Sequence, residues 1–208
     1  GNEVGRLANY YGIDSHKLME IFCKDTKLNL SPYYLRPGFA FGGYCLPKDL
    51  RGINYMAKKG GVEIPLLNGA LESNDKHIQR AADKAKELGA KKVLMLGITF
   101  KEDIDDLRES PYLTLLTLMK KNGFETKFFD QNFRLETLIG ANREYALEIE
   151  PDLFKMQIEK LEKEEDYDLI IIGTFNDNSK IDEIIGKNVK ILDLRGKLRG
   201  KNNCYLIV

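Results

Sequence analysis

The segment 42–49, Gly-Gly-Tyr-Cys-Leu-Pro-Lys-Asp, holds the residues best suited to chemistry. Pro47 predicts the first position of a helix that runs to about Lys59, because proline is favoured there. The unpaired N–H groups and the dipole of a helix N-terminus favour an anion, and Lys48 adds a positive charge near Cys45. Both effects promote the thiolate, which is the nucleophilic form of Cys45. The alternative interpretation is that Cys45 is a small buried hydrophobic residue.

The neighbours of Cys45 extend this interpretation. Gly42 and Gly43 lack side chains, which lets a substrate carbon come close to the sulfur. Asp49 lies one helical turn after Cys45. It could be a first-turn carboxylate that only complements the helix dipole.

The other cysteines and the two histidines offer little further chemistry. Cys23, Cys45 and Cys204 are an odd number at wide spacing without a CxxC pair, so we expect reduced thiols and no zinc or other metal site. His16 and His77 lie among charged residues on helix-like stretches, so we predict that both are solvated on the surface. A cysteine hydrolase, which needs a histidine partner and an oxyanion hole, is therefore disfavoured.

Composition excludes several classes of partner. Lysine plus arginine equals aspartate plus glutamate at 32 each, which argues against binding nucleic acid or an anionic membrane surface. No apolar run approaches the ~20 residues needed to cross a membrane. The chain starts with neither the basic residues nor the apolar stretch of a signal peptide, so we expect a cytoplasmic protein.

The first part of the chain has the pattern of helices. Residues 2–23 predict a helical hairpin, in which Gly12 ends one helix and Asp14 or Ser15 caps the next. Residues 27–47 combine prolines, glycines and aromatic residues, which predicts one long, ordered binding loop. A further helix should run from Pro65 to about Leu88.

Beyond Gly89 the pattern changes to short apolar strands separated by helices. The strand candidates are 93–96, 124–130, 169–173 and 189–192. Such alternation predicts an α/β fold with a doubly wound, Rossmann-like parallel sheet covered on both faces. We therefore expect a helical domain at 1–89 and a Rossmann-like domain at 90–208. Lys101 follows the first strand, at the edge where such folds bind ligands, and suits a diphosphate unless it is an ordinary surface lysine.

The segment 36–49, Arg-Pro-Gly-Phe-Ala-Phe-Gly-Gly-Tyr-Cys-Leu-Pro-Lys-Asp, resembles the catalytic segment of the UDP-glucose/GDP-mannose dehydrogenase family. Its first six residues are most similar to the branch of that family that acts on GDP-mannose. A second block, 96–101 followed by 105–111, resembles the family's C-terminal domain, and so does Asn-Arg-Glu-Tyr at 142–145. The resemblance spans nearly the whole chain.

The resemblance implies oxidation of a nucleotide sugar's primary alcohol to a carboxylate by two hydride transfers to NAD, with a cysteine trapping the intermediate aldehyde. By it, Cys45 is the nucleophile and Asp49 acts on the hydrolytic water. The positions that match the family's substrate contacts are Asn2, Tyr33, Tyr34, Arg36, Phe39, Gly42 and Lys101, and those that match NAD contacts are Lys48 and Arg108. Arg108 could instead simply pair with Asp105 or Asp106.

The resemblance also implies a homodimer through the helical domain, with Arg36 able to reach the neighbouring subunit's site. The family's N-terminal NAD-binding domain, and the lysine and asparagine that assist catalysis, have no counterpart here, so we expect a fragment that does not turn over alone. Tyr44 departs from the small residue, often serine, that the family places before the cysteine. The rival hypothesis is a non-enzymatic protein that uses the same surfaces for nucleotide-sugar binding or dimerisation.

Overall fold

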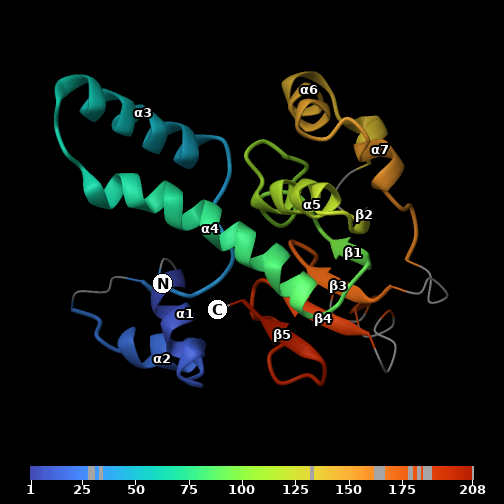
Figure 1. Ribbon diagram of the computed structural model, residues 1–208, viewed down its shortest axis with the longest axis horizontal. Helices are drawn as coiled ribbons and strands as arrows, with labels where there is room; N and C mark the ends of the chain where they lie inside the picture. The colour runs from blue at the N-terminus through green and yellow to red at the C-terminus, as the bar shows by residue number, and fades with distance from the viewer. Residues whose placement is uncertain are drawn as a thin grey trace.

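The computed structural model describes residues 1–27, 31–32, 35–131, 134–161, 167–177, 180–181, 184 and 189–207. Helices make up the first part of the chain, and a sheet with its covering helices follows (Figure 1). The elements in order are α1 (Asn2–Tyr10), α2 (Ser15–Phe22), α3 (Cys45–Gly60), α4 (Pro65–Glu87), β1 (Lys92–Leu96), α5 (Pro111–Lys121), β2 (Glu125–Phe129), the 3-10 helix η2 (Leu135–Thr137), α6 (Gly140–Ile149), α7 (Leu153–Met156), β3 (Leu169–Ile172), β4 (Lys190–Asp193) and β5 (Cys204–Leu206).

The sheet has the order β2-β1-β3-β4-β5, and all its pairs are parallel. Apolar side chains of each strand alternate between two hydrophobic clusters. Val93 and Met95 face the cluster that α4 and α5 complete, whereas Leu94 and Leu96 face a second cluster around Phe175. The predicted α/β fold with a parallel sheet is therefore confirmed. The four strand candidates became β1 to β4, and β5 was not predicted because its three residues carry too short a pattern.

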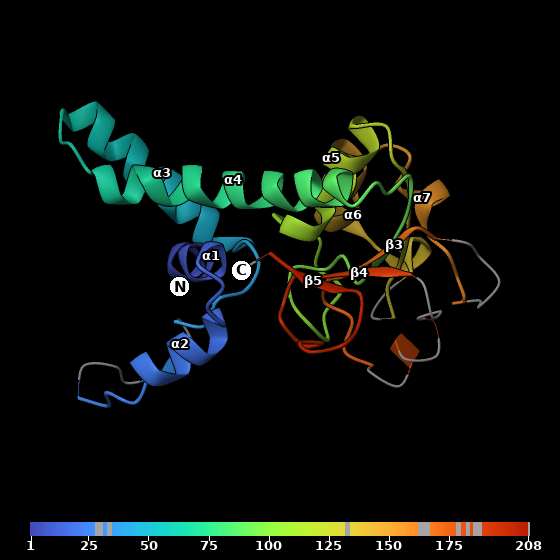
Figure 2. The ribbon, with the colours of Figure 1, turned by 60° about the horizontal axis from the view of Figure 1, so that its bottom comes forward.

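The helical part consists of two hairpins. The α1–α2 hairpin turns at Gly12, and the Asp14 side chain accepts hydrogen bonds from the backbone N–H groups of His16 and Lys17, as the capping pattern predicted. The α3–α4 hairpin extends away from the sheet, and the C-terminal half of α4 returns to pack against it (Figure 2). The change from helix to sheet falls between Glu87 and Lys92. The division into two domains stays a prediction.

Two predictions about the helices were wrong. Helix α3 begins at Cys45 and not at Pro47, so Cys45 is its first residue and Tyr44 its N-cap. His16 and His77 are buried, with 8% and 1% of their surfaces exposed, and not solvated. The reason is long-range packing: His16 lies against Gly196, and His77 hydrogen bonds to the Gly38 carbonyl. Local charge patterns contain no information about either contact.

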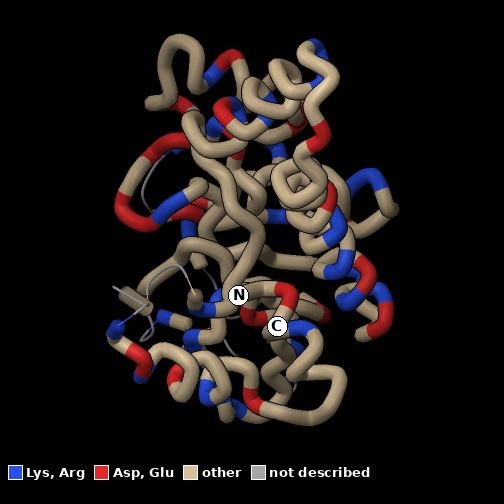
Figure 3. The backbone as a smooth tube through the Cα atoms, turned by 90° about the vertical axis from the view of Figure 1, so that its left-hand side faces the viewer, with Lys and Arg blue, Asp and Glu red and all other residues tan. Residues whose placement is uncertain are grey.

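Positively and negatively charged residues are interspersed along the tube on the side drawn in Figure 3, and neither sign fills that side. Among the described residues, no helix is long and apolar enough to span a membrane.

Candidate functional site

Cys45 begins α3 and is exposed to solvent. The alternative interpretation of this cysteine as a buried hydrophobic residue is therefore wrong. Lys48 and Asp49 follow within the first turns and are also exposed, with 3.3 Å between the Lys48 Nζ and the Asp49 Oδ1. The pKa of Lys48 is raised, chiefly by its hydrogen bond to Asp49. The sulfur, a cation and a carboxylate thus lie on neighbouring turns of one helix.

The turn at 105–109, from the C-terminal part of the chain, packs directly against the segment that leads to Cys45. The Gly43 N–H group donates to the Glu109 carbonyl at 3.2 Å. A Cβ at Gly42 would lie 2.3 Å from the same oxygen, and a Cβ at Gly43 would lie 2.8 Å from the Phe100 ring. Close packing therefore accounts for both glycines, whereas contact between Gly42 and a substrate stays a prediction.

Arg108 reaches the cysteine segment from this turn. Its guanidinium group donates to both carboxylate oxygens of Asp106, at 2.9 and 2.8 Å, so the predicted ion pair forms with Asp106. The same group lies 4.8 Å from the centre of the Tyr44 ring, and the Lys48 Nζ lies 5.2 Å from it. The pKa of Arg108 is raised, chiefly by its hydrogen bond to Asp106. The structure thus brings both candidate NAD contacts, Lys48 and Arg108, to the residue beside Cys45.

The Asn-Arg-Glu-Tyr block supports the turn at 105–109. The Asn142 side chain accepts from the Leu107 N–H group at 2.9 Å and donates to the Asp105 carbonyl at 2.8 Å. The Tyr145 hydroxyl group is hydrogen bonded to the Glu109 backbone, although burial is the main cause that raises its pKa. This block therefore holds the turn in the position from which Arg108 reaches Tyr44.

The described part of the 27–44 segment contains no α-helix or strand, in agreement with the predicted loop, and side chains of α1 and α4 fix its course. The Asn2 amide accepts from the Gly38 N–H group at 2.8 Å and donates to the Phe39 carbonyl at 3.2 Å. Asn74 bonds in the same two ways to Phe41, at 2.8 and 3.0 Å. Asn2 therefore positions the loop, and a contact between its side chain and substrate stays a prediction.

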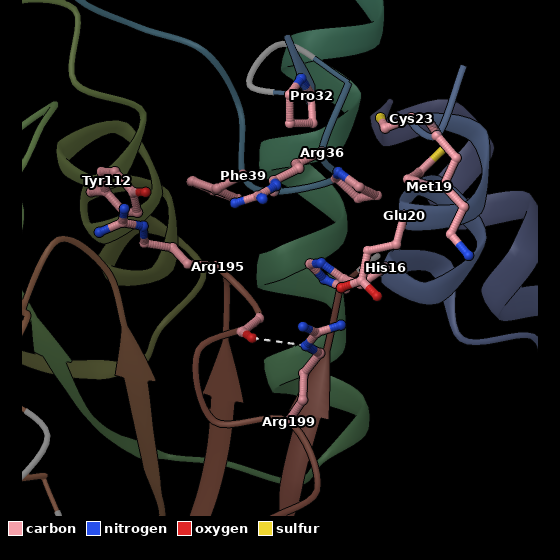
Figure 4. Close-up of a pocket in the computed structure, with 14 residues that line it drawn as sticks. His16, Met19, Glu20, Cys23, Pro32, Arg36, Phe39, Tyr112, Arg195 and Arg199 are labelled. Atoms are coloured by element: carbon pink, nitrogen blue, oxygen red, sulfur yellow. Dashed lines mark hydrogen bonds between the residues drawn. The ribbon is translucent and has the colours of Figure 1, made fainter. Parts of the chain in front are cut away.

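A pocket of about 630 Å³ lies between α2, this loop and the segment after β4. His16, Met19 and Cys23 line one side and Tyr112 and Arg195 the other, with Arg36, Phe39 and Arg199 completing the wall (Figure 4). Four of its side chains carry positive charge, namely Lys24, Arg36, Arg195 and Arg199, against the one carboxylate of Glu20. This excess suits a phosphate-bearing ligand.

The remaining predicted residues are placed less directly. Phe39 is partly buried and packs on Tyr112, with 5.1 Å between ring centres. Lys101 is exposed in the turn after β1, as predicted, but is not part of the pocket lining. Its neighbour Glu102 forms ion pairs with Arg195 and Lys197. Tyr33 and Tyr34 lie outside the described residues.

Arg195 and Arg199 were missed by the sequence reasoning. Both follow β4 at the carboxyl end of the sheet, where doubly wound folds bind ligands, and this position was the available signal. Asp193 shapes their loop, because its carboxylate accepts hydrogen bonds from the N–H groups of Arg195, Gly196 and Leu198.

Two models of one protein family match the chain. The profile of the UDP-glucose/GDP-mannose dehydrogenase family, central domain, matches residues 1–76, and that of the same family's UDP binding domain matches residues 94–199. The chain belongs to the UDP-glucose/GDP-mannose dehydrogenase family.

Several relatives are known. The chain is 42% identical over 173 residues to GDP-mannose 6-dehydrogenase of Pseudomonas syringae pv. syringae, covering 83% of this chain and 40% of that protein. The GDP-mannose 6-dehydrogenase of Azotobacter vinelandii is 38% identical over 197 residues, which cover 94% of this chain and 45% of that protein. A ternary complex of GDP-mannose dehydrogenase from Pseudomonas aeruginosa superposes with a TM-score of 0.75 at 36% identity, covering 99% of this chain and 48% of that one. The chain therefore spans less than half the length of these relatives.

Proposed function

We propose that this chain is the nucleophile-bearing and substrate-binding part of a nucleotide-sugar 6-dehydrogenase that oxidises GDP-mannose, with UDP-sugars as the alternative substrates. The observation that carries the proposal is the exposed Cys45 at the start of α3, next to Tyr44, whose ring contacts Arg108 of the C-terminal part. The identity of 38–42% to GDP-mannose 6-dehydrogenases supports the choice of sugar.

In this proposal the Cys45 thiolate adds to the aldehyde carbon of the half-oxidised sugar and forms a thiohemiacetal. Loss of hydride from that carbon gives a thioester, and water then releases the carboxylate and the free thiol. Asp49 lies one turn from Cys45 and is exposed, so its carboxylate can accept a proton from this water. In the described part of the chain, neither histidine hydrogen bonds to Cys45, so Asp49 is the better candidate for the base.

NAD, when bound, would accept the hydrides. Lys48 and Arg108 fit a role in holding it, because both cations lie at the exposed start of α3 and a dinucleotide carries an anionic diphosphate. They remain proposed contacts. The 208-residue chain alone should form no NADH, because its relatives are more than twice as long and a separate dinucleotide-binding domain is part of the proposal.

The pocket beside α2 is the proposed site of the nucleotide diphosphate. Arg36, Arg195 and Arg199 supply positive charge, and the Phe39 ring supplies an apolar surface for a base or sugar. Lys101 is proposed to add a further charge from the turn after β1, and Tyr33 and Tyr34 to add aromatic contacts.

We also propose a homodimer through the helical part. Exposed apolar side chains gather there, including Leu7, Tyr10, Ile21, Phe22 and Met56, each at least 56% exposed. Such residues are typical of a covered surface. Analytical ultracentrifugation tests this proposal at about 100 µM, a concentration well above the Kd of a stable dimer. A purely monomeric chain under these conditions would contradict it.

Calorimetric titration of the chain with GDP-mannose, GDP and UDP tests the function. We expect weak binding that favours the guanine nucleotides and is lost in Arg199→Ala, with no NADH formed. Absence of binding by all three compounds would sink the proposal. NADH production above background would show that the chain is active alone. Binding without any turnover, once a dinucleotide-binding domain is supplied, would favour a non-enzymatic binding protein.

A further inference from the structure

Tyr44 stands where the family that the chain resembles often has a small residue. It is the N-cap of α3, directly before Cys45, and 51% of its surface is exposed. Two cations lie close to its ring, the Lys48 ammonium group at 5.2 Å and the Arg108 guanidinium group at 4.8 Å from the ring centre.

We propose that Tyr44 is a positioning residue whose ring holds the side chains of Lys48 and Arg108 as two fixed cations beside Cys45. The inference rests on the proposed role of Cys45 as the nucleophile. The ring face attracts a cation within about 6 Å of its centre, and both groups lie inside that limit. A serine at this position would offer no such face to either cation.

Each cation is held from a second direction as well. Asp106 binds the Arg108 guanidinium group through two hydrogen bonds, and Asp49 lies 3.3 Å from the Lys48 ammonium group. A carboxylate alone leaves a long side chain free to rotate about the contact, whereas a carboxylate and a ring together restrict its direction. Tyr44 is therefore the common support of two cations that come from different parts of the chain.

The two cations also act on the sulfur. The Lys48 and Arg108 pKa values are raised first by Asp49 and Asp106, and then also by the charges of Cys45 and Tyr44. Cations that move freely in water interact more weakly with a neighbouring charge than cations held in place, because solvent and salt screen them more strongly.

The reaction of Cys45 with iodoacetamide tests the proposal, because the thiolate displaces iodide and only the thiolate reacts at a useful rate. The 208-residue chain and its Tyr44→Ser and Tyr44→Phe variants are alkylated from about pH 6 to about pH 9, and each cysteine is followed by peptide mass spectrometry. We expect Tyr44→Ser to slow the alkylation of Cys45 about two- to fivefold at neutral pH, because the two cations are then no longer held beside the sulfur. Tyr44→Phe keeps the ring and should match the original chain.

Two controls separate this effect from a general change in structure. Tyr55→Ser removes a tyrosine that is 68% exposed on the same helix, and it should leave the Cys45 profile unchanged. Cys204 is an internal reference, because burial raises its pKa to about 11 and it should react slowly in every variant. Proton NMR gives a second measurement, in which the ring-current shifts of the Lys48 and Arg108 side chains disappear in Tyr44→Ser and persist in Tyr44→Phe.

The outcomes are distinct. An unchanged Cys45 profile in Tyr44→Ser, or an equal loss in Tyr44→Phe, overturns the proposal. Absence of ring-current shifts in the original chain also overturns it. If the Tyr44 dependence holds but no nucleotide sugar binds, the positioning role stands and only the proposed function fails. If nucleotide sugars bind but Tyr44→Ser changes nothing, the function stands without this role.

Discussion

The guanidinium group of Arg51 donates hydrogen bonds of 2.6 and 3.2 Å to the two carboxylate oxygens of Glu109. Arg51 belongs to α3, whereas Glu109 directly precedes the Ser110 cap of α5. Glu109 has φ of 54°, in the left-handed region that costs about 1–2 kcal/mol for a residue with a side chain. The ion pair therefore joins α3, which carries Cys45, to the turn that carries Arg108. It does so at Glu109, whose strained backbone is held in place by such contacts.

Removing this ion pair should weaken the junction, the contact between α3 and the turn at 105–109. Arg51→Gln is expected to lower the free energy of unfolding by about 0.5–1 kcal/mol, because the pair is partly exposed and screened by solvent. Urea unfolding at low and high salt measures it, and the difference between the chains should shrink as salt increases. Lys76→Gln breaks an exposed pair within α4 and should have a smaller effect. An equal loss in both variants would contradict a special role for the junction.

A side chain at Gly42 should be poorly tolerated. In Gly42→Ala the new Cβ would meet the Glu109 carbonyl at 2.3 Å and the Pro111 Cδ at 2.5 Å. Overpacking of this kind costs about 1–3 kcal/mol, which thermal or urea unfolding can measure. Gly38→Ala is the matched control in the same loop, since a Cβ there has open space. A Gly42→Ala variant as stable as Gly38→Ala would show that the two segments are not in contact.

Asn74 should contribute to stability through the loop. Asn74→Ala removes hydrogen bonds to both the N–H and the carbonyl group of Phe41, and we expect a loss of about 1–3 kcal/mol. Asn68→Ala, on the same helix, changes an exposed side chain that has no hydrogen bond in the described part of the chain. It should be neutral or slightly stabilising, because alanine favours helices. Hydrogen exchange of the Phe41 amide would show which contact was lost.

Stability should decrease as the pH is lowered below about 6.5, the ordinary pKa of histidine. Burial is the main cause that lowers the His77 pKa in the folded chain, so the unfolded chain binds the proton more tightly. The stabilisation is present above the unfolded pKa and is lost progressively as the pH falls. His77→Gln, which can keep the hydrogen bond to Gly38, should make the free energy of unfolding less dependent on pH. An unchanged dependence would mean that His77 is not buried in solution.

His16 is the control for this pH effect. Its pKa is also lowered, chiefly by burial and then by Arg199, so His16→Gln should remove part of the same dependence. The double variant should have the flattest profile between about pH 7.5 and about pH 5.5. If the free energy of unfolding depends equally on pH in the original chain, both single variants and the double variant, other groups than His16 and His77 are responsible.

Short-range patterns predicted the elements well, because helix caps and strand burial depend on neighbouring residues. Asp14 caps α2 as its residue type indicated, and Pro65 begins α4. The apolar strands predicted the parallel sheet. β5 was missed, because three half-buried residues do not form a recognisable period.

The candidate site was predicted only in part. The segment around Cys45 and the position of Lys101 after β1 followed from local sequence. The contact of Arg108 with Tyr44 and the burial of His16 did not, because each depends on segments far apart in the chain. Arg195 and Arg199 were missed although they follow β4 at the carboxyl end of the sheet.

The segment from Gly42 to Asp49 shows both contributions. Its sequence alone determined a cysteine at a helix N-terminus with a lysine and an aspartate on the next turn, since a helix brings residues three and four apart together. Only the tertiary structure decided that Cys45 is exposed, that the glycines admit the Glu109 carbonyl, and that Tyr44 meets Arg108. Local spacing sets what lies along one helix, whereas packing between distant segments sets what lies across from it.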